Sequence, residues 1–243
     1  MRRTVGLRCV PHFTTVQKAC LRLLRLPRAR RLLRATIRRH LGRRRCVRCA
    51  AFDSTGLDCG HRSAYYVRRR STSSKRWQRM TYRRFAKLEL AVDTVNHVVV
   101  GCLVGRGPRP DTDRYVPLLQ VTSRNVQVEA TVADAGYDSE PNHTYAREVA
   151  GVRSFMPATI GRPTAKLPTG RYRRQMKQRL NKDYGHYGQR WQVECTNSMI
   201  KRRITTTVAA RSYWGQCREL LLIVLTYQCM LESSSPPTDD DLE

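Results

Sequence analysis

Three acidic residues in this 243-residue chain have surroundings that suit a cation-dependent reaction. Asp53 interrupts an apolar stretch, and Asp134 follows an alternation of valine and alanine and precedes a glycine turn. A charge in an apolar strand is unfavourable, so Asp53 requires a cation, a hydrogen-bonding partner or an altered pKa. We expect Asp134 at the carboxyl end of its strand, which is where ligands bind in α/β sheets. The third residue, Glu194, lies in a segment with helical periodicity.

A stripe of polar side chains accompanies Glu194 on its predicted helix. At about 100° per residue, Tyr187, Arg190, Glu194 and Lys201 fall within a stripe about 60° wide and about 21 Å long. This stripe borders the apolar positions that the helix is expected to bury. The alternative interpretation is a solvated face with an Arg-to-Glu pair four residues apart, which by itself is common.

The spacing Tyr187-x2-Arg190-x3-Glu194-x6-Lys201 resembles the Y-R-E-K signature of bacterial and archaeal insertion-sequence transposases of the DDE type. Asp53-Ser54-Thr55 resembles the first motif of that family, and Ala133-Asp134-Ala135-Gly136-Tyr137 resembles the second. The motifs occur in the same order as in the family. The similarity covers about residues 45–230. It implies a ribonuclease-H-like core, with the first acid on the first strand, the second just after the fourth strand and the third on a later helix.

The resemblance also implies a mechanism and partners. Asp53, Asp134 and Glu194 would be the catalytic triad and would bind two Mg²⁺ ions, for which Mn²⁺ substitutes. The reaction would be cleavage of the transposon end, followed by attack of the freed 3′-hydroxyl on target DNA. Arg190 and Lys201 would hold the flanking phosphates, and Tyr187 would lie near a sugar or phosphate. The implied partners are double-stranded transposon ends and target DNA, with a homodimer on paired ends.

Two other groups of residues compete for these roles. Asp93 is a rival for the first acid, but it follows the second predicted strand and is expected to be a hairpin residue. Cys46, Cys49, Cys59 and His61 have ligand types that suit zinc. We reject that site, because ten residues of predicted strand would separate Cys49 from Cys59 by roughly 30 Å. The nine cysteines are odd in number and fit reduced thiols.

Charge is distributed unevenly along the chain. The net charge is +27, and residues 1–50 carry sixteen Lys or Arg and no acid. Such a segment attracts polyanions and gives salt-sensitive, sequence-independent affinity for nucleic acid. Improved solubility is the alternative, and the excess of Arg over Lys by itself fits a GC-rich genome. The longest apolar stretch, 220–231, is about 12 residues long and too short to span a bilayer. We therefore expect no membrane contact and a cytoplasmic, nucleoid-associated protein.

The elements that must position these residues follow from hydrophobic periodicity. Helices are predicted at 14–41 with a break at Pro27, then at 115–122, 139–150, 171–180, 189–204 and 213–231. Strands are predicted at 50–58, 87–92, 98–104, 126–132 and 152–156, with loops at 62–84 and 105–110. Asp111 or Thr112 is expected to cap the helix that follows. This order predicts an α/β fold, a mixed sheet of three antiparallel strands and then parallel strands, flanked by helices.

The predicted organisation has three parts. Residues 1–45 form a basic helical segment, expected to be a truncated DNA-binding region because family members are commonly longer at this end. Residues 46–231 form the catalytic domain, and residues 232–243 a disordered acidic tail. Two other functions remain open at this point: a non-catalytic DNA-binding remnant, and a nuclease of the same fold that cuts without joining strands.

Overall fold

The computed structural model describes residues 11–23, 25–42, 45–60, 85–158, 166–180 and 184–234. The helices are α1 (Phe13–Leu23), α2 (Leu26–Leu41), α4 (Tyr115–Ser123), α5 (Glu140–Thr144), α6 (Arg171–Arg179), α7 (Tyr184–Tyr187), α8 (Trp191–Arg203) and α9 (Tyr213–Ser234). The strands are β1 (Cys46–Val47), β2 (Ala50–Cys59), β3 (Phe85–Asp93), β4 (Val99–Gly107), β5 (Gln127–Val128), β6 (Ala130–Ala133), β7 (Arg153–Phe155) and β8 (Thr207–Val208). Single turns between them are η1 (Thr112–Arg114), η2 (Ala135–Tyr137), the π-helical η3 (Tyr145–Val149) and η4 (Gly188–Arg190).

The central sheet is mixed, with strand order β4-β3-β2-β6-β7. β2, β3 and β4 are antiparallel and come first in the chain, whereas β6 and β7 join the sheet in parallel. β8 pairs with the far end of β2, and β1 and β5 form a separate parallel pair. The predicted α/β fold class, a ribonuclease-H-like mixed sheet flanked by helices, is confirmed.

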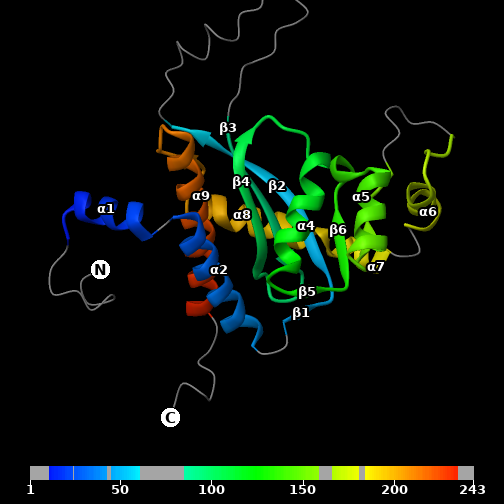
Figure 1. Cartoon of the computed structure of the whole chain (residues 1–243), viewed down its shortest axis with the longest axis horizontal. Helices are drawn as coiled ribbons and strands as arrows, with labels where there is room; N and C mark the ends of the chain where they lie inside the picture. The colour runs from blue at the N-terminus through cyan, green and yellow to red at the C-terminus, as the bar shows by residue number, and fades with distance from the viewer. Residues whose placement is uncertain are drawn as a thin grey trace, which may run out of the picture.

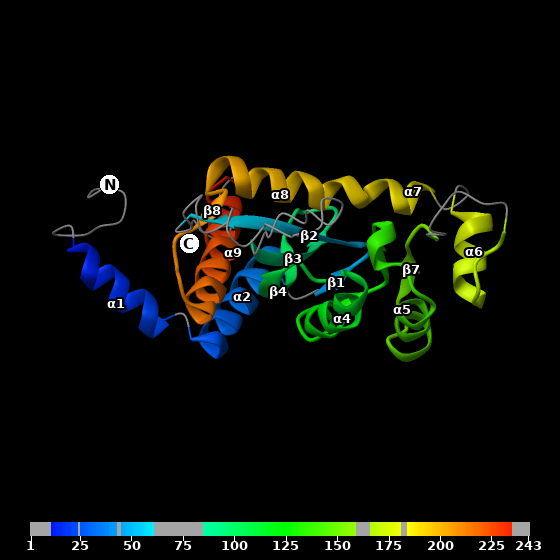
Figure 2. The same cartoon turned by 90° about the horizontal axis from the view of Figure 1, so that it is seen from above.

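Helices cover both faces of this sheet (Figures 1 and 2). In Figure 2, α7 and α8 run along one side of the sheet, and α4 and α5 lie on the other. Every residue of β3 from Ala86 to Asp93 is buried, because the strand is central and both of its faces are covered. The alternation of apolar and polar side chains in β3 therefore marks two buried faces, one of which contains Lys87 and Glu89.

The first two helices meet at a proline, as predicted. α1 ends at Leu23, α2 begins at Leu26, and Pro27 lies in the first turn of α2, where its missing N–H has no helical partner to lose. α2 packs beside α9, and its apolar side chains Ala29, Leu33 and Ile37 are buried in the same core as the sheet. The division of the chain at residue 45 stays a prediction.

Several predicted boundaries differ from the observed ones. β4 runs to Gly107, so the expected loop 105–110 is partly strand, because β3 continues opposite it to Phe85. The predicted strand 126–132 is divided into β5 and β6, which pair with different partners. Neither Asp111 nor Thr112 caps α4, because the Asp111 carboxylate accepts a hydrogen bond from Lys87 and the Thr112 hydroxyl donates to Gly136 O.

Some predictions fall partly or wholly outside the described residues. These are the loop 62–84 and most of the tail 232–243, of which Glu232, Ser233 and Ser234 belong to α9. Among the described helices, none has the length and apolar character to cross a membrane.

Candidate functional site

The sheet brings Asp53 and Asp134 to neighbouring positions. β2 and β6 are parallel and paired through Ala50↔Thr131, Ala51↔Val132 and Phe52↔Ala133. Asp53 and Asp134 are the next residue on each chain, and paired strands lie about 4.8 Å apart. Asp134 follows the carboxyl end of β6, as predicted. The two acids are 81 positions apart in the sequence and adjacent in the sheet.

The environment of Asp53 disfavours its charge. The pKa of Asp53 is raised from 3.8 to about 6. Burial is the main cause and the Asp134 carboxylate adds to it, whereas hydrogen bonds from the Ser54 backbone and from Asn197 and the charge of Arg190 act in the opposite direction. Two acids side by side with incomplete compensation favour either a proton or a cation between them.

Asp134 is packed closely against Gly136. Its backbone is extended, and its Oδ1 accepts a hydrogen bond from Gly136 N at 2.9 Å. A Cβ at Gly136 would lie 3.0 Å from Asp134 Oδ1 and 3.5 Å from Asp111 Oδ2. Any other residue here would therefore fill the space between two carboxylates.

The third predicted acid, Glu194, lies in the first turn of α8. Its side chain is half exposed, and its Oε1 is 2.6 Å from Arg190 Nη2. Arg190 lies within the field of both Glu194 and Asp53, and Tyr187 lies within the field of Asp134 and Glu194. Arg190 and Tyr187 therefore lie among the three acids, with Arg190 paired to Glu194.

The helix that carries this stripe is not continuous. Tyr187 ends α7, and the 3₁₀ turn η4 separates it from α8, which begins at Trp191. The predicted single helix 189–204 is therefore correct only from Trp191 onward, and the predicted 60° stripe does not extend unbroken to Tyr187. Lys201 is seven residues after Glu194 on α8, about 10 Å along the same face. Among the described residues it makes no hydrogen bond or ion pair.

Asn197 completes the site, and the sequence interpretation missed it. Its Nδ2 donates to Asp53 Oδ2 at 2.8 Å, and this hydrogen bond links α8 to β2. Its Oδ1 is buried and has no partner in the described structure. The available signal was position, since Asn197 is three residues after Glu194 and so lies on the same side of the helix.

A second acidic cluster lies on the other face of the sheet. Asp53 is opposite Leu90 in β3, so Glu89 and Lys87 project to the face away from Asp53. Lys87 Nζ is 2.6 Å from Asp111 Oδ1 and 3.8 Å from Glu89. Arg114 Nε donates to both oxygens of Glu89, at 3.0 and 2.8 Å. Each carboxylate of this cluster has a cation in contact with it.

Asp93, the rival for the first acid, is a hairpin residue as predicted. Its Oδ1 accepts from Val95 N at 3.2 Å, and its Oδ2 accepts from the Asn96 side chain at 2.7 Å. Both bonds stabilise the turn between β3 and β4.

The donor set near Asp53 and Asp134 fits a divalent cation in part. Two oxygen-bearing side chains and an incompletely compensated charge favour Mg²⁺. Within the described ranges, however, no three acidic, His or Cys side chains are grouped closely enough to hold a metal ion. The third predicted acid, Glu194, is paired with Arg190 instead.

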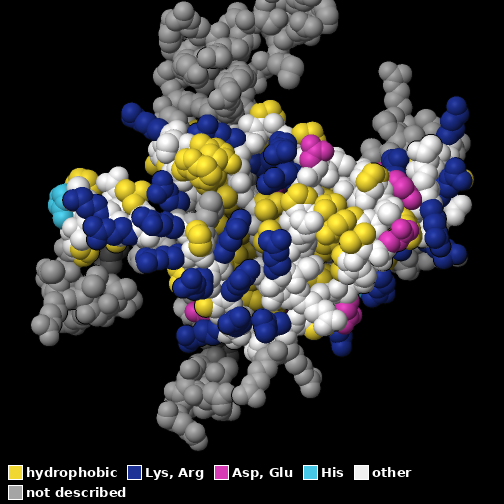
Figure 3. Space-filling model, in the orientation of Figure 1, with side chains coloured by type: hydrophobic (Ala, Val, Ile, Leu, Met, Phe, Trp, Pro, Cys, Tyr) yellow, Lys and Arg dark blue, Asp and Glu magenta, His cyan; other side chains and the backbone are white. Residues whose placement is uncertain are grey.

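The surface over α2 is rich in cations. Figure 3 shows Lys and Arg side chains gathered over α2 and its neighbours, with few acids among them. The exposed arginines of α2 are Arg28, Arg30, Arg31, Arg34, Arg38 and Arg39. Such a surface favours a polyanionic partner.

Comparison with known protein families identifies a match over most of the chain. A family model described as "Transposase DDE domain" matches residues 44–229. No curated protein matches the chain.

Proposed function

Because the chain belongs to the transposase DDE domain family, whose members catalyse DNA transposition with divalent metal, we propose that it is an insertion-sequence transposase of the Y-R-E-K group. In this proposal Asp53, Asp134 and Glu194 are the catalytic acids, and the chain cleaves transposon-end DNA and joins it to a target. The proposal includes the cytoplasm as its location and a homodimer on paired ends. The main support is the register that makes Asp53 and Asp134 neighbours, together with the bond from α8 to Asp53.

The residues on β2 and β6 would hold the metal. A bound divalent cation would activate the attacking water and stabilise the leaving 3′-oxygen. Asn197 orients the Asp53 carboxylate toward α8, and the Gly136 N–H orients Asp134. Glu194 would serve as a third ligand if Arg190 released it.

In this proposal the Arg190 guanidinium can pair with either of two anions, the Glu194 carboxylate or a DNA phosphate. In the free protein its guanidinium pairs with Glu194 at 2.6 Å. A phosphate of the DNA strand offers a bidentate partner for the same group. DNA binding would thus transfer Arg190 from the carboxylate to the phosphate and leave Glu194 available. Lys201 would contact a more distant phosphate on the same face.

The test is Glu194→Gln, which keeps the size of the side chain and removes its charge. We expect loss of Mg²⁺-dependent strand cleavage by at least about 100-fold, because a ligand to the metal is lost, with salt-sensitive DNA binding retained. Glu129→Gln, a change at an exposed acid of the β5–β6 connection, is the matched control. Cleavage retained by Glu194→Gln would refute its metal role.

A strand-transfer assay separates the remaining alternatives. A transposase links the new 3′-end to a second DNA, whereas a nuclease of this fold releases cut ends only. A DNA-binding remnant shows neither product, with Mg²⁺ or with EDTA.

A further inference from the structure

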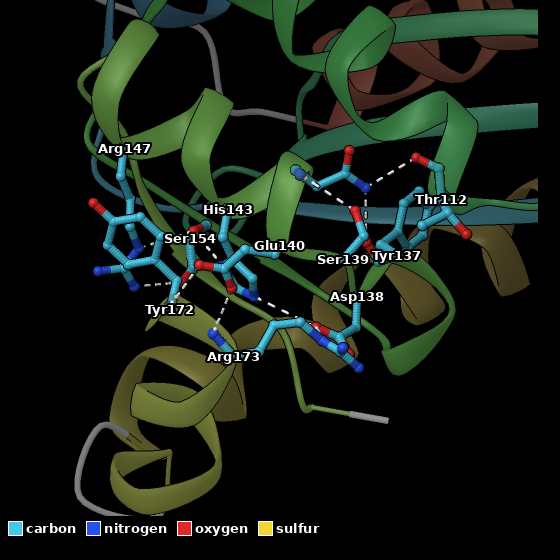
Figure 4. A network of polar contacts seen from close by, with 11 residues as sticks. Thr112, Tyr137, Asp138, Ser139, Glu140, His143, Arg147, Ser154, Tyr172 and Arg173 are labelled. Atoms are coloured by element: carbon cyan, nitrogen blue, oxygen red, sulfur yellow. Dashed lines mark hydrogen bonds and ion pairs between the residues drawn. The ribbon is translucent and has the colours of Figure 1, made fainter. Parts of the chain in front are cut away.

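The arginine-rich helix α6 is fixed to the body of the protein by a buried acid. The Asp138 side chain is fully buried, and Arg173 Nε lies 3.1 and 2.9 Å from its two oxygens. Arg173 Nη2 adds a contact at 2.8 Å. Figure 4 shows Arg173 extending from α6 toward Asp138. A charge-assisted pair of this geometry defines both position and orientation.

A second acid holds the start of the same helix. Glu140 accepts hydrogen bonds from Tyr172 N at 3.0 Å and Arg173 N at 3.1 Å. A carboxylate at this point satisfies two amides that have no partner within the helix and interacts favourably with the helix dipole. The Tyr172 hydroxyl donates to Glu148 at 2.8 Å, and the Arg147 guanidinium lies 5.1 Å from the centre of the Tyr172 ring.

These contacts place α6 relative to the candidate site. Asp134 precedes the single turn η2 and Asp138 follows it, so one short segment carries both a proposed catalytic acid and the residue that anchors α6. Figures 1 and 2 both place α6 at the same end of the molecule as α7, which leads into Arg190 and Glu194.

The side of α6 that faces away from the body is cationic. Met176 is buried against the body, and at about 100° per residue Arg171, Arg174 and Lys177 lie on the opposite side, within an arc of about 120°. All three side chains are exposed, and in the described part of the chain none is paired with a carboxylate. Figure 3 shows the acids of this region between α5 and α6 and the dark-blue side chains on the outside.

We propose that this outer face of α6 binds the backbone of the double-stranded DNA that flanks the phosphate at Asp53 and Asp134. The proposal rests on the function proposed above, since it assumes a DNA strand at that site. Charge complementarity identifies the occupant, and the nine-residue helix, about 12 Å long, matches about three to four base pairs. The acids of α5 hold the inner side of α6, which leaves the outer cations for phosphates.

The experiment measures the salt dependence of binding to an end-containing duplex. The triple variant Arg171→Ser, Arg174→Ser and Lys177→Ser removes the outer cations and keeps Arg173 and Tyr172 in place. We expect the slope of log K against log salt to fall by about 2 to 3, and the affinity at 0.15 M salt to drop by at least about tenfold.

A matched variant controls for net charge. Arg124→Ser, Arg153→Ser and Arg211→Ser removes three exposed arginines that lie outside α6 and outside the basic segment 1–50. We expect the control to change the slope by less than about 1. The proposal would be overturned if the α6 variant had the same salt slope as the unaltered protein. It would also be overturned if the control variant lost as much of the slope as the α6 variant.

The outcomes separate this proposal from the proposed function. If the unaltered protein cleaves DNA with Mg²⁺ and the α6 variant keeps its slope, only the role of α6 is refuted. If the unaltered protein binds but does not cleave, and the α6 variant loses its slope, the role of α6 stands and the transposase activity is refuted. Equal thermal melting of the variants shows that each is folded.

Discussion

The acids on the two faces of the central sheet have different neighbours. On the face of the sheet away from Asp53, two acids each contact a cation. Asp111 is 2.6 Å from Lys87, and Glu89 is 2.8 Å from Arg114. On the face toward α8, Asp53 receives one hydrogen bond from Asn197, and the nearby Asp134 opposes its charge. The first group is balanced within the protein, whereas the second leaves negative charge for something else to balance.

The difference shows why acidic residues of the same type have different expected roles. A carboxylate with its own Lys or Arg loses that partner if a metal ion takes its oxygens, so it is a poor ligand unless another anion takes over the cation, as proposed for Arg190 beside Glu194. A carboxylate without such a partner gains from a cation, because the repulsion from its neighbour is relieved. The two groups adjoin at Gly136, where Asp134 and Asp111 approach the same point.

The largest expected effect compares Asp134→Asn with Asp111→Asn. Asp134→Asn should reduce Mg²⁺-dependent cleavage by at least about 100-fold, because it removes a charge from the proposed metal ligands. Asp111→Asn should leave cleavage per folded molecule within about threefold of the unaltered protein. The measurement is single-turnover cleavage of end DNA at saturating Mg²⁺. If both variants lost cleavage activity equally, Asp111 would contribute to cleavage as much as Asp134, and the distinction between the two clusters would be wrong.

The second prediction concerns the contribution of the Lys87–Asp111 ion pair to the stability of the protein. Asp111→Asn should lower the free energy of unfolding by about 3 kcal/mol, because it leaves the buried Lys87 ammonium without its closest carboxylate. The double change Lys87→Met with Asp111→Leu should recover most of that loss, since no buried charge is then left unpaired. Urea unfolding at pH 7 measures both. A single variant as stable as the unaltered protein would show that Asp111 is not needed to balance Lys87.

The smallest effect is the pH dependence from Asp53. Its folded pKa of about 6 lies above the ordinary value of 3.8, so ionisation disfavours the folded state. The stability that its neutral form provides is present below pH 3.8 and is lost as pH rises through about 6. The Asp53→Asn variant stays neutral at both pH values. Its free energy of unfolding should therefore be about 2 kcal/mol higher than that of the unaltered protein at pH 8, and nearly equal to it near pH 3.5. Denaturant unfolding in EDTA at the two pH values measures this, and a constant difference would contradict the raised pKa.

Much of the fold could be predicted because its signals are local. The helical repeat around Tyr115, Leu118 and Leu119 and the alternation in β3 depend on residues a few positions apart, and both elements are observed. The two-residue strands β1 and β8 were not predicted. They are defined by partners more than 70 residues away, and two residues show no period.

Parts of the candidate site depend on contacts that no local pattern reveals. The turn η4 replaces a helical turn where Gln189 accepts a hydrogen bond from Thr94, at the end of β3. Asp111 was expected to cap a helix, which its type favours, but a buried ammonium from another strand binds it instead. In both cases a tertiary partner overrides the local preference.

The sequence by itself determined the charge of the surface, the order of most elements and the choice of Asp53, Asp134 and Glu194 as candidates, since composition, periodicity and motif spacing are properties of the chain. Only the tertiary structure decided which acids are neighbours, which have cations and which helix approaches them. The physical reason is that the field at a carboxylate depends on distances across strands and between helices, and these are fixed only when the sheet pairs β2 with β6 and packs α8 over them.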